Sequence, residues 1–235
     1  MALFGRIVIA AVLAGLLAGL VNAGLQQWRL VPLILHAETF ETGGTAHDHA
    51  AATGQAANEH LHDKAWTPAD GFERTGYTVL ATTLAGIGFA LALAALATLT
   101  GLALTPATGL FWSLGGFVAV SLAPALGLAP ELPGMPAADL GARQLWWWGV
   151  VLATATAALI LAKWRNGTAL GIALVLCALP HLIGAPQPPE AATKVPAELA
   201  SAFAANAIGV AFAFWLICGT ALGYLMSRPT SQETT

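Results

Sequence analysis

Residues 75–130 read TGYTVLATTLAGIGFALALAALATLTGLALTPATGLFWSLGGFVAVSLAPALGLAP and contain no charged side chain. A helix needs about 20 apolar residues to cross the hydrocarbon core of a bilayer, which is roughly 30 Å thick. The stretch is therefore long enough for two crossings. Because proline cannot continue a helix from within, the segment around Pro106 and Gly109 predicts a turn. We expect two transmembrane helices here, over residues 76–103 and 109–128.

The composition of the whole chain places it in the same class. Of its 235 residues, 57% are hydrophobic and only 9% are charged, whereas soluble domains carry about 25% charged residues. The mean hydropathy is +0.72. The two cysteines, Cys177 and Cys218, lie in apolar segments, where we expect small buried hydrophobes rather than a disulfide framework. The chain is predicted to be an all-α integral membrane protein.

The charged residues divide the chain into about six predicted spans. Pro180 shortens the fifth, so five spans with one re-entrant or interfacial segment remain an alternative. Tryptophan prefers the membrane interface, and Trp146–Trp148 and Trp164 mark the two ends of the fourth span. A single membrane domain, residues 1–235, would then contain spans at about 6–28, 76–103, 109–128, 144–163, 167–184 and 202–226.

The distribution of charge predicts an orientation. With six spans both termini share a side, and that side carries Arg6, Lys163, Arg165 and Arg228 close to span ends. Apart from Glu233, the acidic residues fall on the other side. The positive-inside rule places the termini in the cytoplasm.

A histidine-containing loop would then face outward, over residues 36–75. His47, His49, His60 and His62 form two His-x-His pairs in the longest polar stretch of the chain. Neutral imidazole suits borderline divalent ions such as cobalt, nickel and zinc. The pattern predicts a metal-collecting loop, and a solvated linker with weak chelation is the alternative. Capture by neutral imidazole is expected to fade as the pH falls through about 6.5.

Other candidate ligands lie where apolar segments end. His36 is followed by Glu38 and Glu41, and His181 follows Pro180. We expect these side chains to receive a metal ion at the outer mouth of a translocation path. An interfacial histidine that binds a headgroup or the backbone is an equal alternative.

Polar and small residues inside the spans form a third pattern. Asn22 and Gln26 are spaced i, i+4 and share a helix face, and Asn206 lies in the last span. Such amides form hydrogen bonds between helices or lend oxygen atoms to a passing cation, and the sequence favours the first role. Small residues recur every four positions at Ala11, Gly15, Gly19 and Ala23, and again at Gly219 and Gly223, which permits close helix packing.

The sequence carries no catalytic signature. It lacks a phosphate-binding Gly-x-x-x-x-Gly-Lys-Ser/Thr loop and paired Glu-x-x-His motifs, and no predicted span has a charged residue at its centre. No basic run indicates nucleic acid. We expect a protein that is not an enzyme and that has no tightly bound cofactor.

Several short motifs, in order, resemble the CbtA family of predicted cobalt transporter subunits. They are residues 32–41 (PLILHAETFE), 130–134 (PELPG), 143–147 (RQLWW) and 180–186 (PHLIGAP). The resemblance implies a multi-spanning protein of the bacterial inner membrane that takes up cobalt for cobalamin synthesis. It also implies a small partner, CbtB, with one span and its own histidine motif. The family is associated with five spans, one fewer than predicted above.

The working hypothesis is a permease subunit that imports a divalent metal, most simply Co²⁺. The metal would be captured by His47, His49, His60 and His62 and passed on by His36, Glu38, Glu41 and His181. A transporter of Ni²⁺ or another divalent metal is the first alternative, because Co²⁺ and Ni²⁺ accept the same donors. A membrane metal sensor or assembly factor, which binds metal without moving it, is the second. Contact with lipid is expected, and a homo-oligomer is left open.

Overall fold

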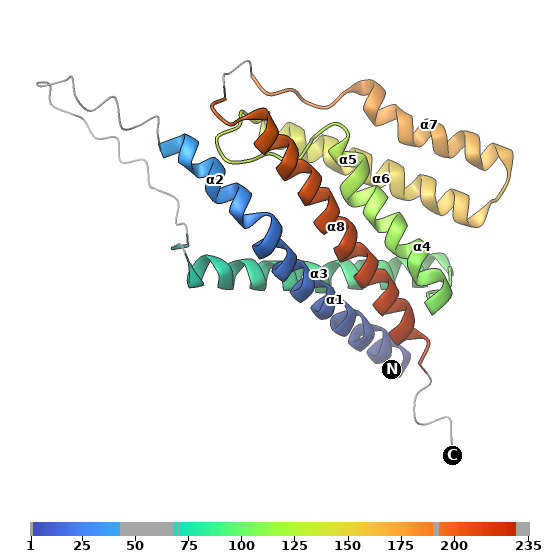
Figure 1. Ribbon diagram of the computed structural model, residues 1–235. Coiled ribbons are helices and arrows are strands. Elements are labelled where there is room, and N and C mark those ends of the chain that lie inside the picture. Colours follow the sequence, from blue (N-terminus) through green and yellow to red (C-terminus); the bar gives the residue numbers. More distant parts are fainter. Residues whose placement is uncertain (1, 43–67, 70, 190–192, 229–235) are drawn as a thin grey trace, which may run out of the picture.

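The computed structural model describes residues 2–42, 68–69, 71–189 and 193–228. Within these ranges the chain is helical and contains no strand. The elements are α1 (Ala2–Arg29), α2 (Val31–Thr42), α3 (Phe72–Thr100), α4 (Pro106–Phe117), the π-helix η1 (Val118–Leu122), α5 (Ala123–Ala125), α6 (Leu140–Lys163), α7 (Gly167–Ile183) and α8 (Ala197–Met226). Figure 1 shows the long helices packed together, with α3 lying across α1 and α8.

Five helical segments are long and apolar enough to cross a membrane: Phe4–Arg29, Phe72–Thr100, Pro106–Ala125, Leu140–Lys163 and Ala197–Met226. They coincide with five of the six predicted spans, and the all-α membrane class is confirmed. The remaining range coincides with α7, which has 17 residues. At 1.5 Å per residue α7 is about 26 Å long, short of the hydrocarbon thickness. A sixth crossing stays a prediction.

The turn between the second and third spans lies slightly earlier than predicted, over residues 101–105, and Pro106 and Gly109 belong to α4. Gly101 ends α3 with φ of 69°, a left-handed conformation that glycine adopts at little cost. Thr105 then caps α4, because its hydroxyl accepts a hydrogen bond from the Thr108 backbone N–H while the Thr108 hydroxyl bonds back to the Thr105 N–H. Pro106 occupies the first helical turn, where its missing N–H is tolerated.

The segment after the first span differs from the predicted loop, because residues 31–42 form a helix. The N–H of Leu30 donates to the carbonyl of Gln26, and the N–H of Ile34 donates to the carbonyl of Leu30. These bonds carry the chain from α1 into α2, and Pro32 falls in the first turn of α2, where no N–H is needed. Figure 1 shows α1 and α2 following each other in nearly the same direction. His36, Glu38 and Glu41 therefore lie on a helix.

Glycines set the closest helix crossings, as the small-residue pattern predicts. A Cβ atom on Gly86 of α3 would lie 2.5 Å from the Gly15 carbonyl oxygen of α1, and one on Gly19 would lie 2.6 Å from Cα of Thr83. At the crossing of α4 and α8, a Cβ on Gly109 would lie 2.7 Å from the Gly219 carbonyl oxygen. Without hydrophobic association between helices in lipid, such backbone contact is a main source of packing energy.

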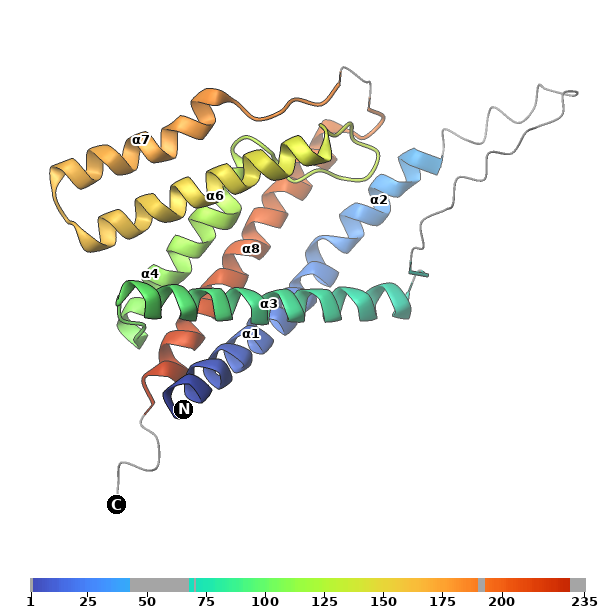
Figure 2. The same cartoon turned by 180° about the vertical axis from the view of Figure 1, so that it is seen from behind.

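Helices α1, α3, α4 and α8 form the core, and α6 and α7 form an antiparallel hairpin beside it (Figures 1 and 2). The ends of α1 and α8 meet, since the guanidinium of Arg6 donates to the Met226 carbonyl at 3.0 Å. At the opposite end, Ala37 of α2 packs in an apolar cluster with Leu132, Val195, Leu199 and Phe203. The first and last helices, α1 and α8, are thus antiparallel neighbours.

Candidate functional site

The predicted metal-collecting histidines lie outside the described residues. His47, His49, His60 and His62 all belong to residues 43–67. Glu41 is in the last turn of α2, but its side chain is likewise outside the described part of the structure. Their role as ligands stays a prediction.

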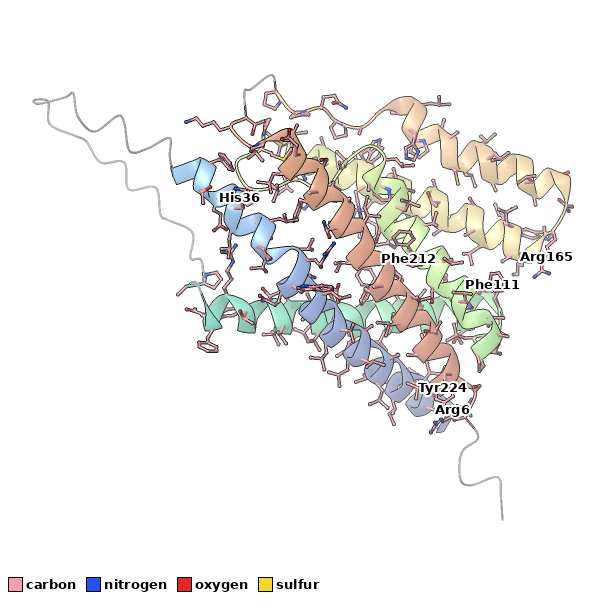
Figure 3. All side chains as sticks on the ribbon, viewed as in Figure 1. Arg6, His36, Phe111, Arg165, Phe212 and Tyr224 are labelled. Carbon is pink, nitrogen blue, oxygen red and sulfur yellow. The ribbon has the colours of Figure 1, made fainter. Side chains whose placement is uncertain are left out.

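His36 lies on the exposed side of α2, at the end of the molecule opposite Arg6 (Figure 3). Its ring is tilted against the Phe40 ring, with centroids 5.5 Å apart, and its carbonyl accepts a hydrogen bond from the Thr39 hydroxyl. The imidazole is therefore at the surface, nearly two helical turns before the end of α2.

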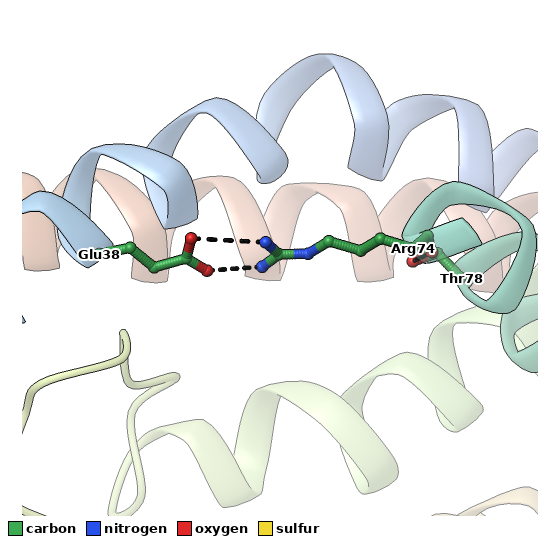
Figure 4. A network of polar contacts seen from close by, with 3 residues as sticks. All are labelled: Glu38, Arg74 and Thr78. Atoms are coloured by element: carbon green, nitrogen blue, oxygen red, sulfur yellow. Dashed lines mark hydrogen bonds and ion pairs between the residues drawn. The ribbon is translucent and has the colours of Figure 1, made fainter. Parts of the chain in front are cut away.

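Glu38 is engaged in an ion pair. The guanidinium of Arg74 donates to both of its carboxylate oxygens, at 2.6 and 3.4 Å (Figure 4). Both side chains are about one-third exposed, so water screens the pair. This fork-shaped contact joins α2 to the start of α3. As a metal ligand, Glu38 would have to leave or share Arg74.

His181 is held by the backbone. Its Nδ1 lies 2.9 Å from the carbonyl oxygen of Cys177, and its Nε2 lies 3.0 Å from the carbonyl oxygen of Ala123. A neutral imidazole donates through one nitrogen only, whereas an imidazolium donates through both. The edge-on ring of Trp146 covers it at 5.7 Å. His181 therefore joins α7 to the first residue of α5, and both of its ring nitrogens face backbone carbonyl oxygens.

The structure does not bring these candidates together. Helices α2 and α7 lie on opposite sides of α8 in both views (Figures 1 and 2), so His36 and His181 do not meet at one mouth. Across residues 2–42, 68–69, 71–189 and 193–228, no three His, Cys, Asp or Glu side chains are grouped to hold a metal ion.

One cavity lies between η1–α5, the start of α6 and α8. Its volume is about 740 Å³. Its wall includes Glu131 and Arg143, which form an ion pair at 3.0 Å, together with the amide of Gln144. Trp147 and Trp148 supply aromatic surface. The cavity therefore offers mixed charge at the end of the bundle where α6 and α8 begin.

A second, inner cavity of about 200 Å³ lies among α1, α3, η1 and α8. Four polar side chains line it: Asn22 and Gln26 of α1, Thr82 of α3 and Ser121 of η1. Ser121, Ala207 and Ala211 line both cavities, so the two adjoin. Together they extend from the start of α6 to the last third of the span Phe4–Arg29.

Three aromatic rings close the inner cavity on its other side. Phe89, Phe214 and Trp215 line it, with ring centroids 5.1 to 6.0 Å apart. The Trp215 indole N–H donates to the Ser121 hydroxyl oxygen at 3.1 Å. Beyond the rings the core is filled by Leu93, Phe117, Cys218, Leu222 and the alanines of α1.

Sequence reasoning singled out Asn22 and Gln26 but missed Ser121. The residue that could have indicated Ser121 is Pro124, because it lacks the backbone N–H that would donate to the carbonyl of Val120 in an α-helix. The helix widens to a π-turn at Val118–Leu122 as a result, and such turns are frequent at functional sites. This turn places Ser121 against both cavities.

A family model described as "Probable cobalt transporter subunit (CbtA)" matches residues 4–227, nearly the whole chain. No match was found among the curated proteins or among the solved structures.

Proposed function

The chain belongs to the CbtA family of probable cobalt transporter subunits, and on this premise we propose that it is a permease subunit that imports Co²⁺. The observation that carries the proposal is the family match over residues 4–227. Several helices long enough to cross a bilayer make the chain a multi-pass membrane protein. A transporter subunit is not itself expected to be an enzyme.

The two adjoining cavities support a path through the chain. An ion from the outer end would meet Glu131 and Arg143 first, and then the polar groups around Ser121. The aromatic closure by Phe89, Phe214 and Trp215 would hold the path shut on the other side. Open at one end and closed at the other, this arrangement is one that alternating access requires.

The proposed orientation has both termini in the cytoplasm of a bacterial cell. The contact of Arg6 with the end of α8 supports termini on one side, and that end also carries Arg228. Helix α8 starts beside Leu132, near the end of the bundle where α6 also starts. After Lys163, at the other end of α6, the chain therefore has to run back to reach the start of α8. We propose that α7 and the residues that follow it make this return, which gives six crossings of the membrane.

We propose that His47, His49, His60 and His62 capture the ion and that His36 and Glu41 assist. The Glu38–Arg74 ion pair supports this, because it joins α2 to α3, the two helices that flank the histidine-containing segment in the sequence. The geometry of His181 favours a structural role for this residue. Capture has to remain weak for release, and mixed imidazole and carboxylate donors suit borderline divalent ions.

The family description as a subunit implies a partner. We propose that it is a small one-span protein of the CbtB kind, whose own histidine motif completes the metal's ligand shell. Ni²⁺ is the alternative cargo, because the same donors accept it. A sensor or assembly factor that binds metal without moving it is the other alternative.

Replacing His47, His49, His60 and His62 by alanine is expected to reduce uptake of radioactive cobalt by cells at low Co²⁺, by about tenfold or more, and far less at saturating Co²⁺. Capture limits uptake only when the ion is scarce. Excess Ni²⁺ or Zn²⁺ as competitor ranks the metals. A variant with His181 alone replaced by asparagine serves as control for a histidine outside the loop. Equal uptake by wild type and the four-histidine variant at every concentration would contradict capture by the loop.

A further inference from the structure

The two amides of the inner cavity form no hydrogen bond with any residue that the structure describes. Asn22 and Gln26 both line the cavity, and both lie within the span Phe4–Arg29. Asn206 behaves differently: its side-chain oxygen accepts from Arg29 at 2.8 Å, and its nitrogen donates to the Ala202 carbonyl at 2.7 Å. A polar group within hydrocarbon costs several kcal/mol unless it finds a partner. The amides of Asn22 and Gln26 therefore call for a polar occupant of the cavity.

The other polar groups of the inner cavity also keep oxygen lone pairs. The Thr82 hydroxyl donates to the Thr78 carbonyl at 2.8 Å, which uses its proton and leaves its oxygen as an acceptor. From the residues that the structure describes, the Ser121 hydroxyl oxygen accepts one hydrogen bond, from Trp215. Each of the four neutral side chains that line this space carries an oxygen atom, and oxygen-bearing side chains are the kind that bind water held by a cation.

Size and charge agree with a hydrated ion. A volume of about 200 Å³ corresponds to about seven water molecules at roughly 30 Å³ each. In the described part of the chain, no Asp, Glu, Lys or Arg lines the inner cavity. Uncharged oxygen atoms bind a cation with lower affinity than a buried carboxylate would, so that the ion can leave again.

We propose that the inner cavity is a transit site for a hydrated divalent cation, held by the side-chain oxygens of Asn22, Gln26, Thr82 and Ser121. This inference rests on the proposed transport function and adds a second site, inside the bilayer, to the histidine loop. The ion keeps its first shell of water, and the protein oxygens accept hydrogen bonds from that water. The rings of Phe89, Phe214 and Trp215 stop it until the helices rearrange.

The test compares cobalt uptake by wild type, Asn22→Leu/Gln26→Met and Gln27→Met. Gln27 is the matched control, because it lies in the same helix and does not line the cavity. The double variant is expected to lower the maximal uptake rate by about tenfold or more, because it removes two groups that bind the ion's water shell. The Co²⁺ concentration for half-maximal uptake, which reports capture by the loop, is expected to change little.

Thr82→Val is the second variant, since it removes one hydroxyl and keeps the shape. A decrease of about threefold or more in the maximal rate, with unchanged thermal stability, is the expected result. If the double variant fails to fold, this variant carries the test. Wild-type rates in the cavity variants would overturn the transit site while leaving the transport function standing. Absence of uptake by wild type would overturn the proposed function and, with it, this inference.

Discussion

Replacing Gly86 by leucine is expected to prevent α1 and α3 from packing and to destabilise the fold by about 3 kcal/mol or more. A Cβ atom at this position would lie 2.5 Å from the Gly15 carbonyl oxygen and 3.1 Å from the Gly19 backbone nitrogen. Backbone atoms cannot move aside as a flexible side chain can, so the helices have to separate. The measurement is the thermal unfolding midpoint of the detergent-solubilised protein, followed by size-exclusion chromatography after heating.

Gly88→Leu is the matched control. Gly88 lies two residues further along α3, and nothing comes within 4 Å of a Cβ atom built there. The same change in side chain and helix propensity is therefore expected to leave the unfolding midpoint nearly unchanged. Equal midpoints for the two variants would contradict the α1–α3 crossing described above.

The second large effect is expected for Trp215→Ala. The Trp215 side chain is 3% exposed and contacts Phe89 and Phe214, with ring centroids 5.1 and 5.5 Å away. It also fills the space that Gly116 leaves by lacking a side chain. Truncation leaves a large void, and the lost contacts are expected to destabilise the protein by about 2 kcal/mol or more. The measurement is again the thermal unfolding midpoint.

Two controls separate packing from the hydrogen bond. Trp215→Phe keeps a six-membered ring and removes the five-membered ring with the N–H that bonds Ser121, so a decrease of about 1 kcal/mol or more, smaller than for alanine, is expected. Trp28→Ala removes a ring that is 70% exposed and is expected to have little effect. A Trp215→Ala protein as stable as wild type would show that the three rings do not close the inner cavity as one packed unit.

Much of the fold could be predicted from the sequence because apolar length and charge punctuation act locally. The uncharged stretch between Arg74 and Glu131 predicted two helices with a turn near Pro106, and these are α3 and α4 with its continuation. The glycine spacing in α1 predicted the close crossing at Gly15 and Gly19. The extension of helix through α2 was not predicted, because His36, Glu38 and Glu41 made the segment resemble a polar loop.

The candidate site was harder to predict, because it depends on which helices become neighbours. Ser121 of η1 and Gln26 of α1 are far apart in sequence, and only the packing of α1, α3 and α8 brings them to one cavity. Ligand type alone was also an incomplete guide. The imidazole of His181 is a good metal ligand by chemistry, yet each of its ring nitrogens lies within hydrogen-bond distance of a backbone carbonyl oxygen. Glu38 likewise faces Arg74.

Cobalt flux into liposomes is the measurement that tests the central claim most directly. Purified wild-type protein, reconstituted with its proposed one-span partner around a Co²⁺-quenched dye, is expected to give saturable quenching that Asn22→Leu/Gln26→Met strongly slows. Protein that binds Co²⁺ at the liposome surface, without quenching the internal dye at any concentration, would contradict transport and favour a membrane metal sensor.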